Sequence, residues 1–126
     1  MKVLIIITIL LLFNKYVYSS NLFDTSIHDV NFISNNIENT KITKINEIKK
    51  KSLLNILKNT LSNERYDELL SDLSDDLINS FIKNVIINDE KIINNKYISK
   101  IKINFNKKKI VEFYRNKNIP YVEYYP

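Results

Sequence analysis

Apolar residues recur at two different intervals along the chain, and the two intervals predict helices and strands. From Ile42 to Leu61 they recur every three or four residues and form one broad stripe at about 100° per residue, which predicts a long amphipathic helix. Ser62 and Ser74 each precede a helical pattern, and a serine oxygen in that position accepts a hydrogen bond from a free backbone N–H. We therefore expect a short helix after Ser62 and another helix start at Ser74.

Alternation of apolar and polar side chains marks the extended segments. Residues 97–105 alternate as a half-buried antiparallel strand does, and residues 81–93 form its partner across a turn at 94–95. Asparagine occupies both turn positions, and it tolerates the positive φ of a tight turn in a chain without glycine. A further strand is predicted over residues 22–33, because this segment is rich in β-formers and ends at the turn signal 34–36.

The register of the predicted hairpin depends on the length of its loop. A two-residue loop pairs Ile86 with Ile103, whereas a three-residue loop pairs Ile87 with Ile103. The sequence is compatible with both registers.

The C-terminal part of the chain continues with a helix and an extended exit. Asn106 caps a helix with Ile110 and Tyr114 on one side, and the Ile-Pro pair at 119–120 leads into a last strand over 121–125. The order β-α-(short α)-β-β-α-β predicts an α+β fold, a small ferredoxin-like split βαβ sandwich. We see no linker and no internal repeat, so a single domain is expected over residues 20–126.

The N-terminus has the plan of a signal peptide. A positive start at Lys2 precedes an apolar run of 11 residues that only Thr8 interrupts, too short for the ~20 residues that span a bilayer. Cleavage is expected after Ser19, which leaves Ser20 as the first residue of the mature chain. The alternative is a retained signal anchor. Residues 1–19 are thus a predicted signal peptide, and the expected location is the periplasm or cell envelope.

Composition narrows the possible chemistry. The chain of 126 residues contains 22 Ile, 19 Asn and 17 Lys, the bias of an AT-rich genome, and it has no Cys and no Gly. Disulfides, thiolate metal sites and glycine-rich phosphate loops are therefore excluded, and we predict no cofactor. Removal of the signal peptide would reduce the net charge from +5 to about +3, which is too small to argue for nucleic acid.

Beyond position 80 the sequence resembles a known family. Residues 81–105 run through Asp-Glu-Lys to an Asn-Asn-Lys-Tyr turn and end in Ile-Asn-Phe. A helix with Val111 and Phe113 follows, and then Asn-Ile-Pro-Tyr at 118–121. Together with the helix from Lys41 to Leu61, this pattern resembles the bacterial exported family called domain of unknown function 2066. The resemblance implies an envelope protein of a Gram-negative bacterium and supplies no catalytic residue.

His28 is the sole histidine and thus the sole candidate for an ordinary catalytic base. Serines and carboxylates are plentiful, but no spacing selects a nucleophile for it, so a surface position is the simpler interpretation. The acidic series from Glu64 to Asp76 lacks the spacing of a calcium loop and is interpreted as a solvated helix face. The first hypothesis is therefore a non-enzymatic binding module, and a small hydrolase that uses His28 is the alternative.

Two further groups of side chains are candidates for binding. Lys107, Lys108 and Lys109 occupy the first turn of the last helix, where cations oppose the helix dipole, so they are candidate contacts for an anionic partner such as a membrane surface. A solvated turn is the simpler interpretation. The aromatic residues of the last segment form either the last strand or an exposed edge for a partner, expected to be another envelope protein; they are Tyr121, Tyr124 and Tyr125.

Overall fold

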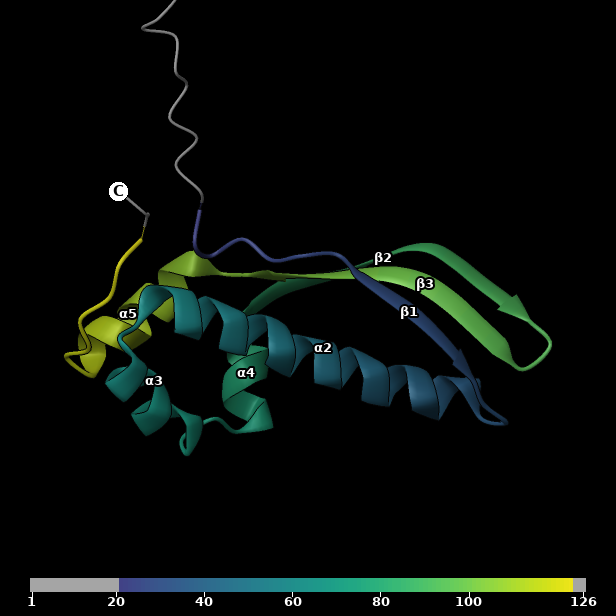
Figure 1. Ribbon diagram of the computed structural model, residues 1–126, viewed down its shortest axis with the longest axis horizontal. Coiled ribbons are helices and arrows are strands. Elements are labelled where there is room, and N and C mark those ends of the chain that lie inside the picture. Colours follow the sequence, from purple (N-terminus) through teal and green to yellow (C-terminus); the bar gives the residue numbers. More distant parts are fainter. Residues whose placement is uncertain (1–20, 124–126) are drawn as a thin grey trace, which may run out of the picture.

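The computed structural model of the chain describes residues 21–123 and has a mixed α+β architecture. The predicted signal peptide, Tyr124 and Tyr125 lie outside these described residues. In Figure 1 the sheet forms an upper layer and α2 runs along beneath it, with α3, α4 and α5 toward one end. In chain order the elements are β1 (His28–Ile33), α2 (Ile37–Thr60), α3 (Asn63–Leu70), α4 (Asp75–Phe81), β2 (Ile82–Ile93), β3 (Lys96–Phe105) and α5 (Lys107–Asn116).

The sheet has the order β1-β3-β2, and both pairings are antiparallel. The central strand β3 buries Tyr97, Ser99, Ile101 and Ile103 on the side that faces α2, as the alternating pattern predicts. The prediction of an α+β fold is therefore confirmed, whereas the described residues contain three strands instead of the predicted four.

The predicted strands over residues 22–33 and 121–125 differ from the structure, each for a local reason. Leu22 and Phe23 are both buried, which a strand with one buried face does not allow for neighbours, and β1 begins only at His28. The segment before β1 instead bonds through a side chain, because the Thr25 hydroxyl donates to the Ile103 carbonyl. At the other end, residues 121–123 form no strand, since the Val122 N–H donates to the Thr60 carbonyl (2.9 Å) and holds the segment at the end of α2.

A bulge in β2 makes both predicted registers wrong. The loop has two residues, Ile93 faces Lys96, and Asn94 takes the predicted positive φ (54°). Further along, Asp89 and Glu90 together face one residue of β3, so the pairing shifts by one. Beyond the bulge, Val85 faces Ile103, and neither Ile86 nor Ile87 does.

Each predicted cap is present, and the helices form a second apolar cluster beside the sheet. The predicted caps Ser62, Ser74 and Asn106 accept hydrogen bonds from the first turns of α3, α4 and α5. Asn36, which was predicted only as part of a turn, caps α2 in the same way. The helix α2 begins at Ile37, five residues before the apolar stripe, because Asn36 already caps it. One core cluster joins the C-terminal half of α2 to α3, α4 and α5, and the other joins the sheet to Ile48 of α2.

Candidate functional site

Two neighbouring hollows of the described surface lie between α2 and the segment that includes β1. The first, here called the Ser52 hollow, has a volume of about 370 Å³ and lies between residues 25–28 and the α2 side chains of Lys51, Ser52, Asn55 and Lys58. The second, the Glu47 hollow, has about 300 Å³ and lies between residues 28–31 of β1 and the α2 side chains of Lys44, Glu47, Ile48 and Lys51. His28 and Lys51 line both hollows, so the two adjoin along one groove.

The strand β1 has unpaired backbone groups along its outer edge, beside the groove. Ser34, just after β1, donates its N–H to the carbonyl of Asn95 in the register of the β1–β3 pairing. Hydrogen-bonded and open residues alternate in an antiparallel pair, so the N–H and C=O groups of Asp29, Asn31 and Ile33 point away from β3. Within residues 21–123 β1 has one strand neighbour, and these groups therefore form a free sheet edge.

His28 joins β1 to α2 at the point where the hollows meet. Its Nε2 lies 3.3 Å from the Oγ of Ser52, within hydrogen-bonding distance, and Ser52 is buried. Burial, together with the positive charge of Lys51, lowers the pKa of the His28 imidazole from its usual 6.5. His28 is therefore neutral at pH 7 in the unliganded protein.

The two hollows differ in charge. Lys51, Lys58 and His28 line the Ser52 hollow, and no carboxylate lines it. In the Glu47 hollow, by contrast, Lys44 forms an ion pair with Glu47 (2.9 Å), and Asp29 adds a second carboxylate. Within the described part of the chain, neither Lys51 nor Lys58 has a carboxylate within ion-pair distance. The Ser52 hollow is thus the cationic end of the groove.

The three predicted lysines at the start of α5 have different environments in the structure. Lys107 lies 3.1 Å from the carboxylate of Glu123, and its ammonium group lies 5.2 Å from the centre of the Phe23 ring. Glu123 thereby supplies the negative charge that the N-terminus of α5 lacks in its own first turn. Lys108 and Lys109 are exposed. Their contact with an anionic partner stays a prediction.

Tyr121 packs against the helical core. Its ring lies 5.3 Å from that of Tyr114, which is fully buried and whose hydroxyl lies 2.7 Å from the Oγ of Thr60. Burial raises the pKa of Tyr114 to about 12. Tyr121 is half-buried, and its role as an edge for a partner stays a prediction.

Sequence reasoning missed a polar cluster at the bulge. Glu90 accepts hydrogen bonds from Lys41 (2.6 Å) and from the Tyr97 hydroxyl (2.8 Å), and these bonds lower the pKa of its carboxyl group. The ring of Tyr97 also stacks on Phe32 of β1, with centroids 5.0 Å apart. No sequence signal locates this cluster, because the bulge determines which way Glu90 points.

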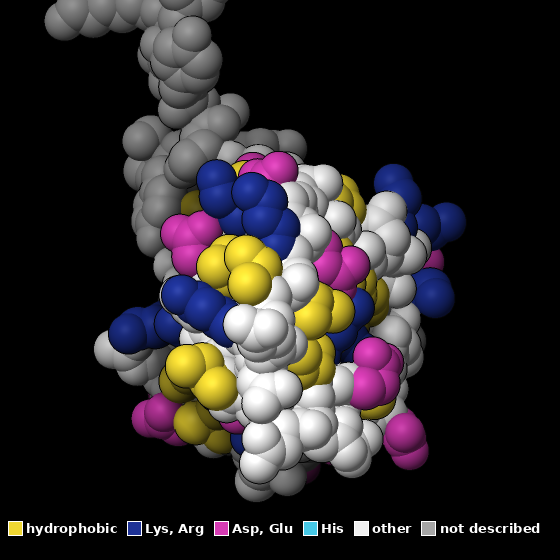
Figure 2. Space-filling model, turned by 90° about the vertical axis from the view of Figure 1, so that its right-hand side faces the viewer, with side chains coloured by type: hydrophobic (Ala, Val, Ile, Leu, Met, Phe, Trp, Pro, Cys, Tyr) yellow, Lys and Arg dark blue, Asp and Glu magenta, His cyan; other side chains and the backbone are white. Residues whose placement is uncertain are grey.

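Hydrophobic side chains are also exposed at the hairpin end of the sheet. Ile33, Ile92 and Ile93 lie there, and Ile33 is 76% exposed. Figure 2 faces this end and shows groups of hydrophobic side chains interspersed with charged and other polar atoms. The apolar surface is therefore divided, which is unlike the continuous patch that marks most protein interfaces.

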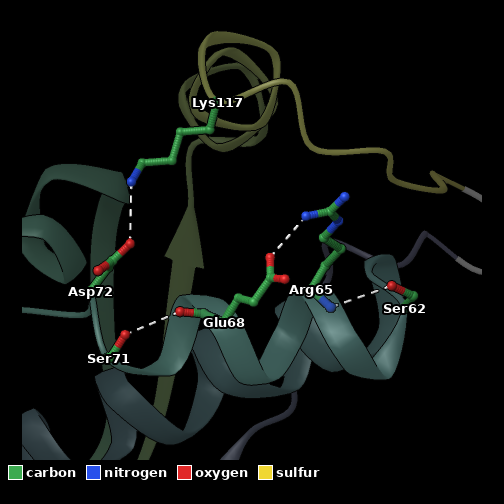
Figure 3. A network of polar contacts seen from close by, with 6 residues as sticks. All are labelled: Ser62, Arg65, Glu68, Ser71, Asp72 and Lys117. Atoms are coloured by element: carbon green, nitrogen blue, oxygen red, sulfur yellow. Dashed lines mark hydrogen bonds and ion pairs between the residues drawn. The ribbon is translucent and has the colours of Figure 1, made fainter.

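The acidic series around α3 takes part in a network that joins two helices. Arg65 pairs with Glu68 (2.9 Å), and Lys117 at the end of α5 reaches Asp72 (3.3 Å), as Figure 3 shows. Residues 21–123 contain no group of three or more His, Asp or Glu side chains that could hold a metal ion. Of this series, Glu68 thus forms an ion pair within α3, and Asp72 joins the end of α3 to the end of α5.

Comparisons with family models, with curated proteins and with solved structures found no match for this chain. No helix within the described residues is long and apolar enough to cross a membrane. The candidate binding site is the β1/α2 groove with the free edge beside it.

Proposed function

We propose that the chain is an exported binding module that takes up an extended segment of another envelope protein along the free edge of β1. The observation that carries the proposal is the regular edge of β1 beside a groove on α2. An added strand would bond to the outward backbone groups of Asp29, Asn31 and Ile33, and its alternate side chains would enter the groove.

The two edges of the sheet differ in a way that favours β1. The edge strand β2 carries a bulge at Asp89 and Glu90, and Asp89 has φ 52°, so the edge is twisted and charged. Such features hinder the addition of another strand. The pairing of β1 with β3 is regular over its six residues, and β1 contains no Lys and no Pro.

A ferredoxin-like architecture would also place an additional strand at the outer edge of β1. We propose that the domain is a ferredoxin-like sandwich that is open on its β1 side. A crossover from β3 through α5 would bring a fourth strand back parallel to β3, and both positions beside β3 are taken by β1 and β2. The next free position is the outer edge of β1, antiparallel to it, and described residues 121–123 lie elsewhere, at the end of α2.

The hydrolase alternative has one supporting observation, the contact between His28 and Ser52. Ser52 lies inside α2, where the backbone N–H groups are committed to the helix and cannot form an oxyanion hole. Within residues 21–123, no carboxylate bonds to the second ring nitrogen of His28 to orient it. A buried serine inside a helix, with no oxyanion hole and no orienting carboxylate among the described residues, fits a binding pocket better than an acyl-transfer site.

Export and family membership are part of the same proposal. The short apolar run before Ser20 supports a cleaved signal peptide, and the pattern over residues 81–121 supports membership of the family called domain of unknown function 2066. A membrane adaptor that uses Lys108 and Lys109 is a second candidate, because both are exposed in the first turn of α5.

Strand addition at β1 is tested by removing one outward N–H. We would select binders from a random-peptide library on the purified protein and compare Asn31→Pro with Asn31→Ala, which keeps the N–H. The expected result is at least ~10-fold weaker binding for Asn31→Pro alone, with both variants unfolding at similar temperatures.

Amide exchange gives a second measurement that needs no variant. The N–H groups of Asp29, Asn31 and Ile33 should exchange rapidly in the free protein and become protected in the complex. Binding that leaves these three amides unprotected would overturn the proposal.

A further inference from the structure

The direction of β1 determines which end of an added strand lies at the cationic Ser52 hollow. The strand β1 runs from His28 at the Ser52 hollow to Ile33 at the hairpin end. Every strand pair in the sheet is antiparallel, and a strand added to β1 in the same manner runs the other way. Its C-terminal end therefore arrives at the Ser52 hollow.

Besides the apolar lining from Ile27, Leu54 and Tyr66, this hollow has polar and cationic groups that suit an anion. Lys51 and Lys58 supply two positive charges, and Ser52, Asn55 and His28 supply hydrogen-bonding groups. The charged groups that face it come from β1 and α2, and the nearest carboxylates in the groove, Asp29 and Glu47, line the neighbouring hollow. An anion that enters thus meets donors and cations without a competing carboxylate in the lining.

We infer that the Ser52 hollow is a carboxylate site, which receives the free C-terminal carboxylate of the segment bound along β1. The inference rests on the proposed function and adds the chemistry and polarity of the partner: an extended C-terminal tail, antiparallel to β1. Lys51 and Lys58 attract the carboxylate, and Ser52 and His28 bond to it.

The test compares three forms of one peptide that differ only at the C-terminus. A peptide selected from the library is synthesised with a free C-terminus, as an amide, and as an amide that carries an aspartate in the last position. We expect the free acid to bind at least ~10-fold more tightly than the plain amide. Equal affinity of the aspartyl amide and the free acid would assign the site to side-chain carboxylates, which overturns the C-terminal assignment.

The two lysines are tested against Lys50, the residue that precedes Lys51 in the sequence. Lys51→Gln and Lys58→Gln should each weaken binding of the free acid about tenfold and leave binding of the amide unchanged. The control is Lys50→Gln, because Lys50 is exposed on α2 and lines neither hollow. An equal effect of all three variants would indicate general electrostatic attraction and refute a built site.

The same experiments separate this inference from the function on which it rests. If free acid and amide bind equally and Asn31 becomes protected in both complexes, the edge binds peptides but the Ser52 hollow is not a carboxylate site. If neither peptide protects Asn31, the proposed function itself fails.

Discussion

A chain of two hydroxyl groups links the end of α2 to α5, and its energetics can be predicted. The Thr60 hydroxyl donates to the Ile56 carbonyl (2.8 Å), so its one hydrogen is in use and its oxygen must accept from the Tyr114 hydroxyl (2.7 Å). Both side chains are buried, so water cannot replace either partner. Tyr114→Phe should therefore destabilise the protein by about 1–1.5 kcal/mol, the net contribution of one buried hydrogen bond.

Thr60→Val has a larger expected cost, because it leaves the Tyr114 hydroxyl as a buried donor without an acceptor. We expect a loss of about 1–3 kcal/mol. In the double variant Thr60→Val/Tyr114→Phe no hydroxyl is left unpaired, so its cost should fall below the sum of the single costs by about 1 kcal/mol. The free energies of unfolding are measured by urea denaturation followed by circular dichroism.

The pH dependence of stability provides an independent check. The pKa of Tyr114 is about 12 in the folded protein against an ordinary value of 10.0, so folding favours the neutral phenol. This stabilisation is complete below pH 10 and is lost as the pH rises toward 12, by up to about 2.7 kcal/mol for two pKa units. The difference between wild type and Tyr114→Phe should shrink over that range. Strict additivity in the double variant, or an unchanged alkaline slope in Tyr114→Phe, would refute the reasoning.

Four further outcomes are expected. His28 has a lowered pKa, so the wild type should lose stability as the pH falls below about 6.5, and His28→Gln should lack this part of the loss, which acid denaturation measures. Asn94→Gly should keep the stability of the hairpin, whereas Asn94→Ala should lower the melting temperature, with a cost of about 1 kcal/mol at φ 54°. Lys108→Glu with Lys109→Glu should raise stability by about 0.3–1 kcal/mol per residue at low salt; loss of co-sedimentation with anionic vesicles would instead favour the membrane adaptor. N-terminal sequencing of native protein should begin at Ser20, and retention of Met1 would contradict cleavage.

The sequence was sufficient for the elements that local chemistry decides. Caps at Asn106 and Ser62, the turn at Asn94 and the buried face of β3 follow from side-chain chemistry and from spacing. The bulge at Asp89 was not predictable from spacing, and neither was the contact beside it, because Glu90 pairs with Lys41 of α2, 49 residues away in the sequence.

The candidate site was predictable only in part. His28 stands out as the sole histidine, whereas its partner Ser52 was not selected. Ser52 nevertheless gives a signal, because it lies four residues from both Ile48 and Ile56 and is thus a polar residue within the buried stripe of α2. Its closeness to β1 depends on how α2 lies beneath the sheet, and spacing alone does not determine that.

The bulge in β2 also limits how many molecules can join through their sheets. A strand that binds to β1 extends the sheet by one position, and further growth from the same molecule would have to use β2, where the pairing is interrupted at Asp89 and Glu90. If β1 binds a strand as proposed, each copy would have a single position for strand addition in the part of the chain described. Complexes formed in that way would close after one step, and the open edge of β1 would not seed filaments.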